Sequence, residues 1–182
     1  ETSPRVKAHN WWQWVFIGAA GVYHTIVPTH GAAEIKTVMG SLWVEVWVCD
    51  CFSAQLTAPA KVFQLCLAHQ LRDLQRVIDA YPQEHWAIAM QALFRDAIHL
   101  RNRFEEMKRV GFKRRVTQIE NQLDRLLEEP VLSNAACKLQ NRYGMHRDKL
   151  LTFYPEVPPT NNYSGPQFWD TGLSCRPWRT VA

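Results

Sequence analysis

The sequence has no long hydrophobic run. No stretch of about 18 apolar residues is free of polar interruption, which argues against a transmembrane helix. The nearest stretch, Trp11–Pro28, contains Gln13 and His24. It follows two basic residues and so loosely resembles a signal peptide. Its aromatic and turn-containing composition nevertheless favours a cytoplasmic chain over an exported one.

The sequence also lacks a regular cysteine pattern and a strong excess of charge of either sign. The five cysteines are odd in number and irregularly spaced, which favours free thiols in a reducing cytosol over a disulfide framework. Lys and Arg number 21 against 17 Asp and Glu, and this net charge of +4 permits a nucleic-acid partner without requiring one. A glycine-rich phosphate loop, a His-Glu-x-x-His helix and a nucleophile-elbow serine are all missing, which excludes these common catalytic signatures.

Apolar and aromatic residues are plentiful. They make up 47% and 12% of the 182 residues, which rules out a disordered chain and suffices for a domain with a real interior. The first part of the chain predicts the order strand, strand, helix, strand, strand, helix, which is typical of α/β folds. The predicted elements are Trp11–Ile17, Val22–Val27, Ala32–Met39, Leu42–Cys49, Val62–Leu65 and Cys66–Ala80. Gly18–Gly21 is a turn signal, so we expect the first two strands to form a hairpin, and Gly40 is the expected C-cap of the first helix.

The second half of the chain is predicted to be helical. Apolar residues at alternating steps of four and three predict a long helix over Glu84–Lys108, and a similar seam follows over Val116–Leu126. Gly111 lies in the break between them, so we expect an antiparallel helical hairpin. A third helix is expected over Asn134–Tyr154, followed by an extended linker and an irregular tail.

Asp50 is the first candidate functional residue. It directly follows Leu42–Cys49, which we expect to be a central strand buried on both faces. Open α/β sheets place their ligands at the carboxyl ends of such strands, so the carboxylate is well placed for chemistry. Capping of a helix that begins near Phe52 is the alternative role.

Cys66 and His69 are the second candidates. They are three residues apart and share one face of a predicted helix, where a thiol and an imidazole can meet one metal ion or each other. Cys49 and Cys51 alternate along a strand and so point to opposite faces, which argues against a four-ligand zinc site. A buried thiol and a satisfied core histidine are the alternative that we favour.

Basic residues concentrate between Arg95 and Arg115. This window carries a net charge of +5, while the rest of the chain sums to −1. A basic end on a helical hairpin suits a phosphate backbone, because neutralised phosphates release counterions. A solvated helix face is the alternative. The candidate DNA-binding residues are Arg72, Arg76, Arg101, Lys108, Arg109, Lys113, Arg114 and Arg115.

Several landmarks along the chain carry a resemblance to a known family. They are Glu1–Ser3, Asn10–Phe16, Val48–Ala54, Gln64–Leu74, His146–Phe153 and Pro158–Asn162. In this order and spacing, residues 1–162 resemble the central catalytic domain of bacterial transposases of the insertion-sequence sixty-six family. The strings Cys-Leu-Ala-His-x-x-Arg-Asp-Leu and Pro-Pro-Thr-Asn-Asn are the specific part of the resemblance.

The resemblance implies an RNase H-like mixed sheet with an α-helical insertion. In such enzymes an Asp-Asp-Glu trio holds two Mg²⁺ or Mn²⁺ ions that promote the cutting and joining of DNA. It implies that Asp50 is the second acid and a metal ligand. Supporting roles are implied for Cys66, His69, Asn161 and Asn162. The implied division is a core over 1–82, a helical insertion over 83–154, a linker over 155–162 and a tail over 163–182 unlike the family.

The sequence also departs from the family pattern. The first acid of the family precedes a Glu-Thr pair, and this sequence starts at that Glu, Glu1. At the position of the third acid stands Gly165, followed by Pro166 where an Arg is usual. His30 replaces a common Arg, and Cys51 replaces a usual Gly. Because one acid of three cannot hold two ions, we predict that this polypeptide alone does not cut or join DNA, and that the final catalytic helix is missing.

These observations predict a truncated, catalytically inactive transposase-derived protein at the bacterial nucleoid in the cytoplasm. DNA is its expected partner, as insertion-sequence ends and target, with a homo-oligomer as a further option and no membrane association. One alternative is a non-catalytic module that binds DNA or oligomerises through the basic hairpin. Another is a chain that does not fold stably, because the tail replaces a packed final helix. Salt-dependent DNA binding and limited proteolysis separate these alternatives.

Overall fold

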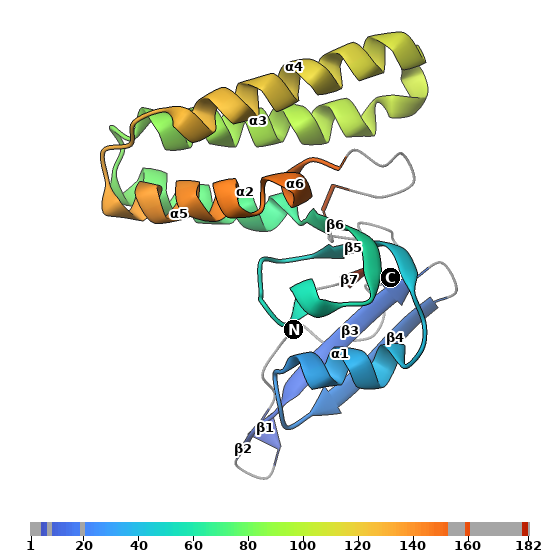
Figure 1. The fold of residues 1–182 in the computed structure, drawn as a ribbon. Coiled ribbons are helices and arrows are strands. Elements are labelled where there is room, and N and C mark those ends of the chain that lie inside the picture. Colours follow the sequence, from blue (N-terminus) through green and yellow to red (C-terminus); the bar gives the residue numbers. More distant parts are fainter. Residues whose placement is uncertain (1–4, 7–8, 19–20, 153–158, 161–179, 182) are drawn as a thin grey trace. The chain divides into compact units, whose positions relative to one another are not determined.

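The computed structural model describes residues 5–6, 9–18, 21–152, 159–160 and 180–181. The chain is of mixed α/β class, as predicted (Figure 1). It divides into two compact units. Unit 1 comprises Glu1–Gln64 and Thr160–Ala182, and unit 2 comprises Leu65–Pro159.

A hairpin of two seven-residue strands forms one side of the sheet in unit 1. Strand β3 (Trp12–Gly18) pairs antiparallel with β4 (Gly21–Val27) over their whole length. Aromatic and β-branched residues favour extended backbone here, and Gly21 adopts a φ of 148° that other residues rarely reach. The predicted hairpin is therefore confirmed. A shorter pair precedes it, β1 (Arg5–Val6) with β2 (His9–Asn10).

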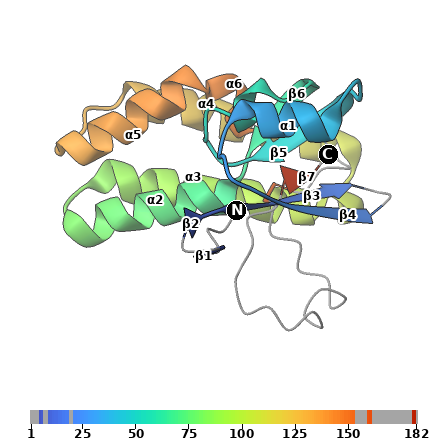
Figure 2. The same ribbon diagram turned by 90° about the horizontal axis from the view of Figure 1, so that it is seen from below.

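The main sheet of unit 1 has the strand order β4-β3-β7-β5-β6 (Figures 1 and 2). Strand β5 (Val44–Cys49) is buried from Val46 to Cys49, as expected of a central strand, and β6 (Ala60–Leu65) lies beside it. Both predicted strands are confirmed with shifted starts. Leu42 and Trp43 are exposed and precede β5.

Strand β7 (Thr180–Val181) corrects the prediction of an irregular tail at these two positions. It runs parallel to β3 and antiparallel to β5, between them in the sheet. The tail has no usable hydrophobic period, but backbone amides and carbonyls of neighbouring strands accept any extended segment, whatever its pattern. The prediction for residues 163–179 lies outside the described residues, as does the predicted loss of a final helix after Asn162.

Helix α1 (Ala32–Met39) lies over one face of this sheet (Figure 2). It buries Ile35 and Met39 and leaves the residues between them more exposed. Gly40 ends the helix with a φ of 55°, and its N–H donates to the Lys36 carbonyl at 2.8 Å. The predicted glycine C-cap is therefore confirmed. Glycine suits this position, because a positive φ strains residues that have a Cβ.

Unit 2 is helical. Its long elements are α2 (Leu67–Ala80), α3 (His85–Asn102), α4 (Arg109–Glu128) and α5 (Asn134–Met145), followed by the single turn α6 (Arg147–Leu150). Helix α3 packs against both α2 and α4, and α5 packs against α2 and α4. A polar contact ties α5 to α2, because Arg142 donates to Asp73 at 2.5 Å and to Gln70 at 2.9 Å.

The α3–α4 pair confirms the predicted hairpin but moves its connection. The first helix was predicted to continue to Lys108, with the break at Gly111. Instead α3 ends at Asn102, a 3-10 turn η2 (Phe104–Glu106) follows, and Gly111 lies in the first turn of α4. The buried side chain of Phe104 explains the early end, since a tight turn places it in the core. The predicted third helix is interrupted at His146, and Phe153 and Tyr154 lie outside the described residues.

A buried carboxylate joins the start of α3 to the connection between α4 and α5. Glu84 is 1% exposed and accepts hydrogen bonds from the Leu132 N–H, the Ser133 N–H and the Ser133 hydroxyl. The same hydroxyl accepts from Ala136 N and caps α5. Charge-assisted hydrogen bonds offset the cost of burying this carboxylate.

In the part of the chain that the structure describes, no helix is both long enough and apolar enough to cross a bilayer. The RNase H-like assignment and the boundary between core and insertion at residue 82 stay predictions. The two compact units are defined by which residues contact one another, and such contacts do not show which segment of the chain is an insertion.

Candidate functional site

Asp50 lies at the carboxyl end of β5, where the sequence predicted it. The strand before it is buried from Val46 to Cys49, and Asp50 itself is half-buried. Its Oδ1 accepts a hydrogen bond from the Phe52 N–H at 2.9 Å, and the Gln55 N–H then donates to the Phe52 carbonyl at 2.9 Å. The carboxylate therefore caps a turn that leads into the 3-10 helix η1 (Gln55–Thr57). The alternative role predicted a helix cap, but no helix begins at Phe52: Asp50 caps a turn instead, and η1 starts at Gln55 without a side-chain cap.

An aromatic stack stands beside this turn. His30 lies between two rings, with its centroid 3.9 Å from that of Trp12 and 4.2 Å from that of Phe52, and both ring pairs are close to parallel. The three side chains come from β3, from the segment before α1 and from the turn after Asp50, and all are half-buried. Because Phe52 also donates its N–H to Asp50, the stack helps to hold the orientation of the carboxylate.

The sequence pattern did not predict this stack. The one signal of it in the sequence is His30, which stands where an Arg is common in the resembled family. Stacking of three rings from separate segments leaves no local pattern, so only the tertiary structure could reveal it.

The described residues do not supply a metal centre. Among them, no three His, Cys, Asp or Glu side chains converge in a way that could hold an ion. Two Mg²⁺ or Mn²⁺ ions need several carboxylate oxygens, and Asp50 alone does not fit that requirement. Asn161, Asn162 and Gly165 lie outside the described residues, so their predicted roles at the site stay predictions.

Cys66 and His69 lie at the start of α2, in unit 2. Cys66 is fully buried, and its carbonyl accepts from the His69 N–H at 3.0 Å. His69 is 8% exposed, and burial, with a further contribution from the charge of Arg72, lowers its pKa to about 3. The imidazole is therefore neutral at pH 7. The alternative of a buried thiol and a core histidine is confirmed as far as burial goes, and no disulfide forms among the described cysteines.

The candidate DNA-binding residues fall into two groups. Arg72 and Arg76 are exposed on α2, where Arg72 donates to its own helix and Arg76 pairs with Asp73 at 2.8 Å. The remaining six gather at the connected end of the α3–α4 hairpin. They are Arg101, Lys108, Arg109, Lys113, Arg114 and Arg115.

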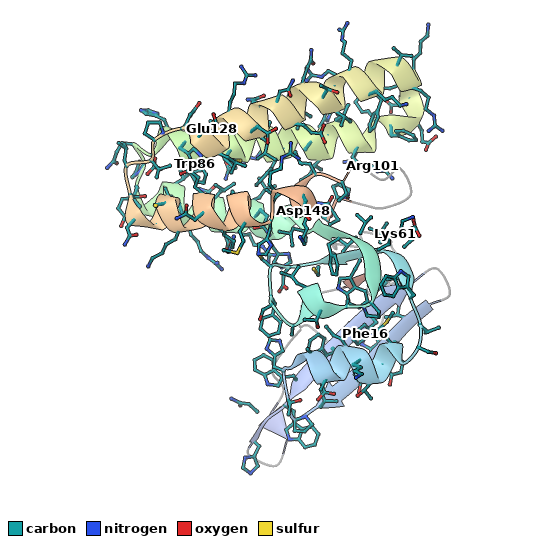
Figure 3. All side chains as sticks on the ribbon, viewed as in Figure 1. Phe16, Lys61, Trp86, Arg101, Glu128 and Asp148 are labelled. Carbon is teal, nitrogen blue, oxygen red and sulfur yellow. The ribbon has the colours of Figure 1, made fainter. Side chains whose placement is uncertain are left out.

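The connected end of the hairpin is strongly basic. Figure 3 shows Arg101 near this end, whereas Trp86 and Glu128 lie near the opposite end. All six side chains are exposed except Arg101, which is half-buried. The first turn of α4 contains no acidic residue, so the positive end of the helix dipole and the basic side chains carry the same sign. An anion at this end would relieve that repulsion.

Comparison with known proteins identifies the family. A family model described as Transposase IS66 family matches residues 1–164, nearly the whole chain. The chain belongs to this family. No curated protein and no solved structure matches it.

Membership of the IS66 transposase family confirms the resemblance seen in the sequence. A transposase family acts on DNA, so membership implies DNA as the partner. The match ends at Ser164, one position before Gly165. The basic hairpin lies inside the matched region and belongs to the family part of the chain.

Proposed function

We propose that this transposase-derived chain binds duplex DNA through the basic connected end of its helical hairpin and does not cut or join DNA by itself. The observation that carries the proposal is the gathering of six basic side chains where α3 and α4 meet. Family membership supplies DNA as the partner, and the charge distribution supplies a surface for it.

Electrostatics support this surface over the rest of the chain. The window from Arg95 to Arg115 carries a net charge of +5, whereas all other residues together carry −1. A phosphate backbone gains from such a concentrated surface, because each neutralised phosphate releases condensed counterions. Acidic side chains are few here, and Arg103 pairs with one of them, Glu106, at 3.2 Å.

Two features support the absence of cutting by this polypeptide alone. Glycine, which has no carboxylate, stands at position 165, where the resembled family has its third acid. Asp50 uses one carboxylate oxygen to cap its own turn, and the described residues around it do not complete a metal-binding trio.

DNA binding is tested by fluorescence anisotropy with a labelled duplex across a range of salt concentrations. The triple variant Lys113→Gln, Arg114→Gln, Arg115→Gln removes three charges from the first two turns of α4. We expect its affinity to fall and the slope of log K against log salt to become shallower by up to about 3, at roughly 0.9 per phosphate contact.

A matched control removes three exposed charges elsewhere, with Lys36→Gln, Arg125→Gln and Lys138→Gln. It lowers net charge equally, so we expect a smaller loss of affinity if position matters. Equal losses in both triple variants, or no DNA binding by the unaltered chain, contradict the proposed surface. Light scattering on the same samples tests the alternative that this end mediates oligomerisation. A change in mass without a change in DNA affinity would favour that alternative.

Catalytic competence is tested on supercoiled plasmid with Mg²⁺ or Mn²⁺, with the unaltered chain beside Asp50→Ala. We expect no nicking or strand transfer above the level of the variant. Activity that Asp50→Ala abolishes would contradict the second half of the proposal.

A further inference from the structure

One aromatic ring contacts two arginines at the connection between α3 and α4. Phe104 lies in the 3-10 turn η2 and is 7% exposed. The guanidinium carbon of Arg101 lies 5.7 Å from the centroid of this ring, and that of Arg109 lies 4.9 Å from it. Arg101 belongs to the last turn of α3 and Arg109 to the first turn of α4, so the ring contacts one positive charge from each helix.

The ring itself is held in place by the core. Phe112, on α4, meets Phe104 edge to face, with ring centroids 4.8 Å apart and an interplanar angle of 83°. Phe112 is also buried, at 6% exposure. Edge-to-face aromatic pairs are a favoured arrangement, so the orientation of Phe104 is fixed by packing.

We propose that Arg101 and Arg109 form a clamp for the phosphate backbone of duplex DNA, and that Phe104 is its positioning residue. This inference rests on the proposed DNA-binding role of the hairpin and goes beyond it. It selects two of the six basic side chains and names the buried ring that arranges them.

Pre-organisation is the physical reason. A free arginine side chain has much rotamer entropy to lose when it binds a phosphate. A cation–π contact restrains the guanidinium before DNA arrives, and its in-plane N–H groups can still donate to phosphate oxygens. Binding then loses less entropy, so affinity gains without any added charge.

The two cation–π contacts with Phe104 single out this pair among the six basic side chains. Arg103, which lies between them in the sequence, forms an ion pair with Glu106 at 3.2 Å. The same turn also contains the exposed acidic residue Glu105. The first N–H groups of α4 and the positive end of its dipole lie beside Arg109, which adds attraction for a phosphate at this point.

The decisive variant is Phe104→Leu, which keeps every charge and most of the apolar volume but removes the aromatic ring. We expect the DNA affinity of the full chain to fall about three- to tenfold, as judged from typical cation–π strengths at exposed sites. The matched control is Phe94→Leu, which shortens a fully buried phenylalanine of α3 that packs on Tyr143. The control should change affinity less than twofold, although it destabilises the same helical unit.

A double-mutant cycle separates positioning from general damage. In an Arg101→Gln, Arg109→Gln background, Phe104→Leu should cause no further loss of affinity, because there is no clamp left to arrange. Phe104→Tyr retains the ring and should restore binding to near the original level. Circular dichroism of each variant reports whether the helices are intact.

The outcomes keep the two proposals apart. If the unaltered chain does not bind DNA, the proposed function fails and the clamp fails with it. If it binds, but Phe104→Leu and Phe94→Leu weaken binding equally, only the clamp is refuted. An undiminished effect of Phe104→Leu in the double-arginine background also refutes it, as does a Phe104→Tyr variant that binds no better than Phe104→Leu. If Phe104→Leu unfolds the helices, the DNA affinities of Phe104→Tyr and of the Arg101→Gln, Arg109→Gln variant are compared instead. Near-original binding by Phe104→Tyr with weaker binding by the double-arginine variant supports the clamp, and equal affinities refute it.

Discussion

Acidification is expected to destabilise the helical unit through His69. This imidazole is 8% exposed, and burial and the charge of Arg72 lower its pKa to about 3 in the folded chain. In the unfolded chain its pKa returns to about 6.5. Between these two values the unfolded state binds a proton that the folded state excludes.

The sign and size of the pH effect on stability follow from this difference in the pKa of His69. A lowered folded-state pKa means that the contribution of His69 is fully present above about pH 6.5 and is lost as the pH falls toward about 3. From pH 7.5 to about pH 5, the free energy of unfolding should fall by roughly 2 kcal/mol through this residue alone. That loss is a large part of the usual stability of a domain.

The assay is urea denaturation followed by the helical circular dichroism signal at several pH values, with His69→Gln as the comparison. Glutamine does not titrate, so the loss between pH 7.5 and about pH 5 should shrink by most of that 2 kcal/mol. His146→Gln is the control. Partial burial and the charge of Lys149 lower the pKa of His146 too. This residue is less deeply buried than His69, so it should account for less of the change in stability with pH.

Two results would refute this reasoning. One is an equal loss of stability in the unaltered chain and in His69→Gln. The other is an NMR titration of the His69 ring nitrogens with a midpoint near 6.5, which would mean that burial does not keep the ring neutral.

Three further predictions concern stability and are checked by urea or thermal unfolding. Glu84→Ala leaves the half-buried donors of Ser133 without their carboxylate acceptor and should cost about 2–4 kcal/mol. A loss below about 0.5 kcal/mol would show that water replaces the carboxylate. Trp86→Phe removes the hydrogen bond from the indole to the Leu126 carbonyl at 2.8 Å and should cost about 1–2 kcal/mol. Gly40→Ala places a Cβ on a residue with a φ of 55° and should cost about 1 kcal/mol, whereas a stabilised variant would contradict the strain.

Local patterns predicted the elements well where packing agreed with them. The aromatic and β-branched runs of β3 and β4, with a glycine turn signal between them, predicted their hairpin, and the apolar run before Asp50 predicted a buried strand that ends there. Both features are local, because the pleat and the strand end depend on a few adjacent residues.

The hairpin connection shows where local patterns fail. The heptad seam continues through Phe104 and Met107, and Gly111 looked like the natural break. Burial of Phe104 against Phe112 ends the first helix earlier than the seam predicts. Gly111 lies within α4, because packing of this helix outweighs the low helix propensity of glycine.

The sequence by itself determined the family, the α/β class, the position of Asp50 and the concentration of positive charge between Arg95 and Arg115. Ordered motifs, hydrophobic periods and charge counts are properties of neighbouring residues, so they can be seen without coordinates. The tertiary structure decided the place of β7 in the sheet, the stack around His30 and the two arginines on Phe104. Each joins side chains or backbone from separate elements, and such contacts depend on how the elements pack rather than on any spacing along the chain.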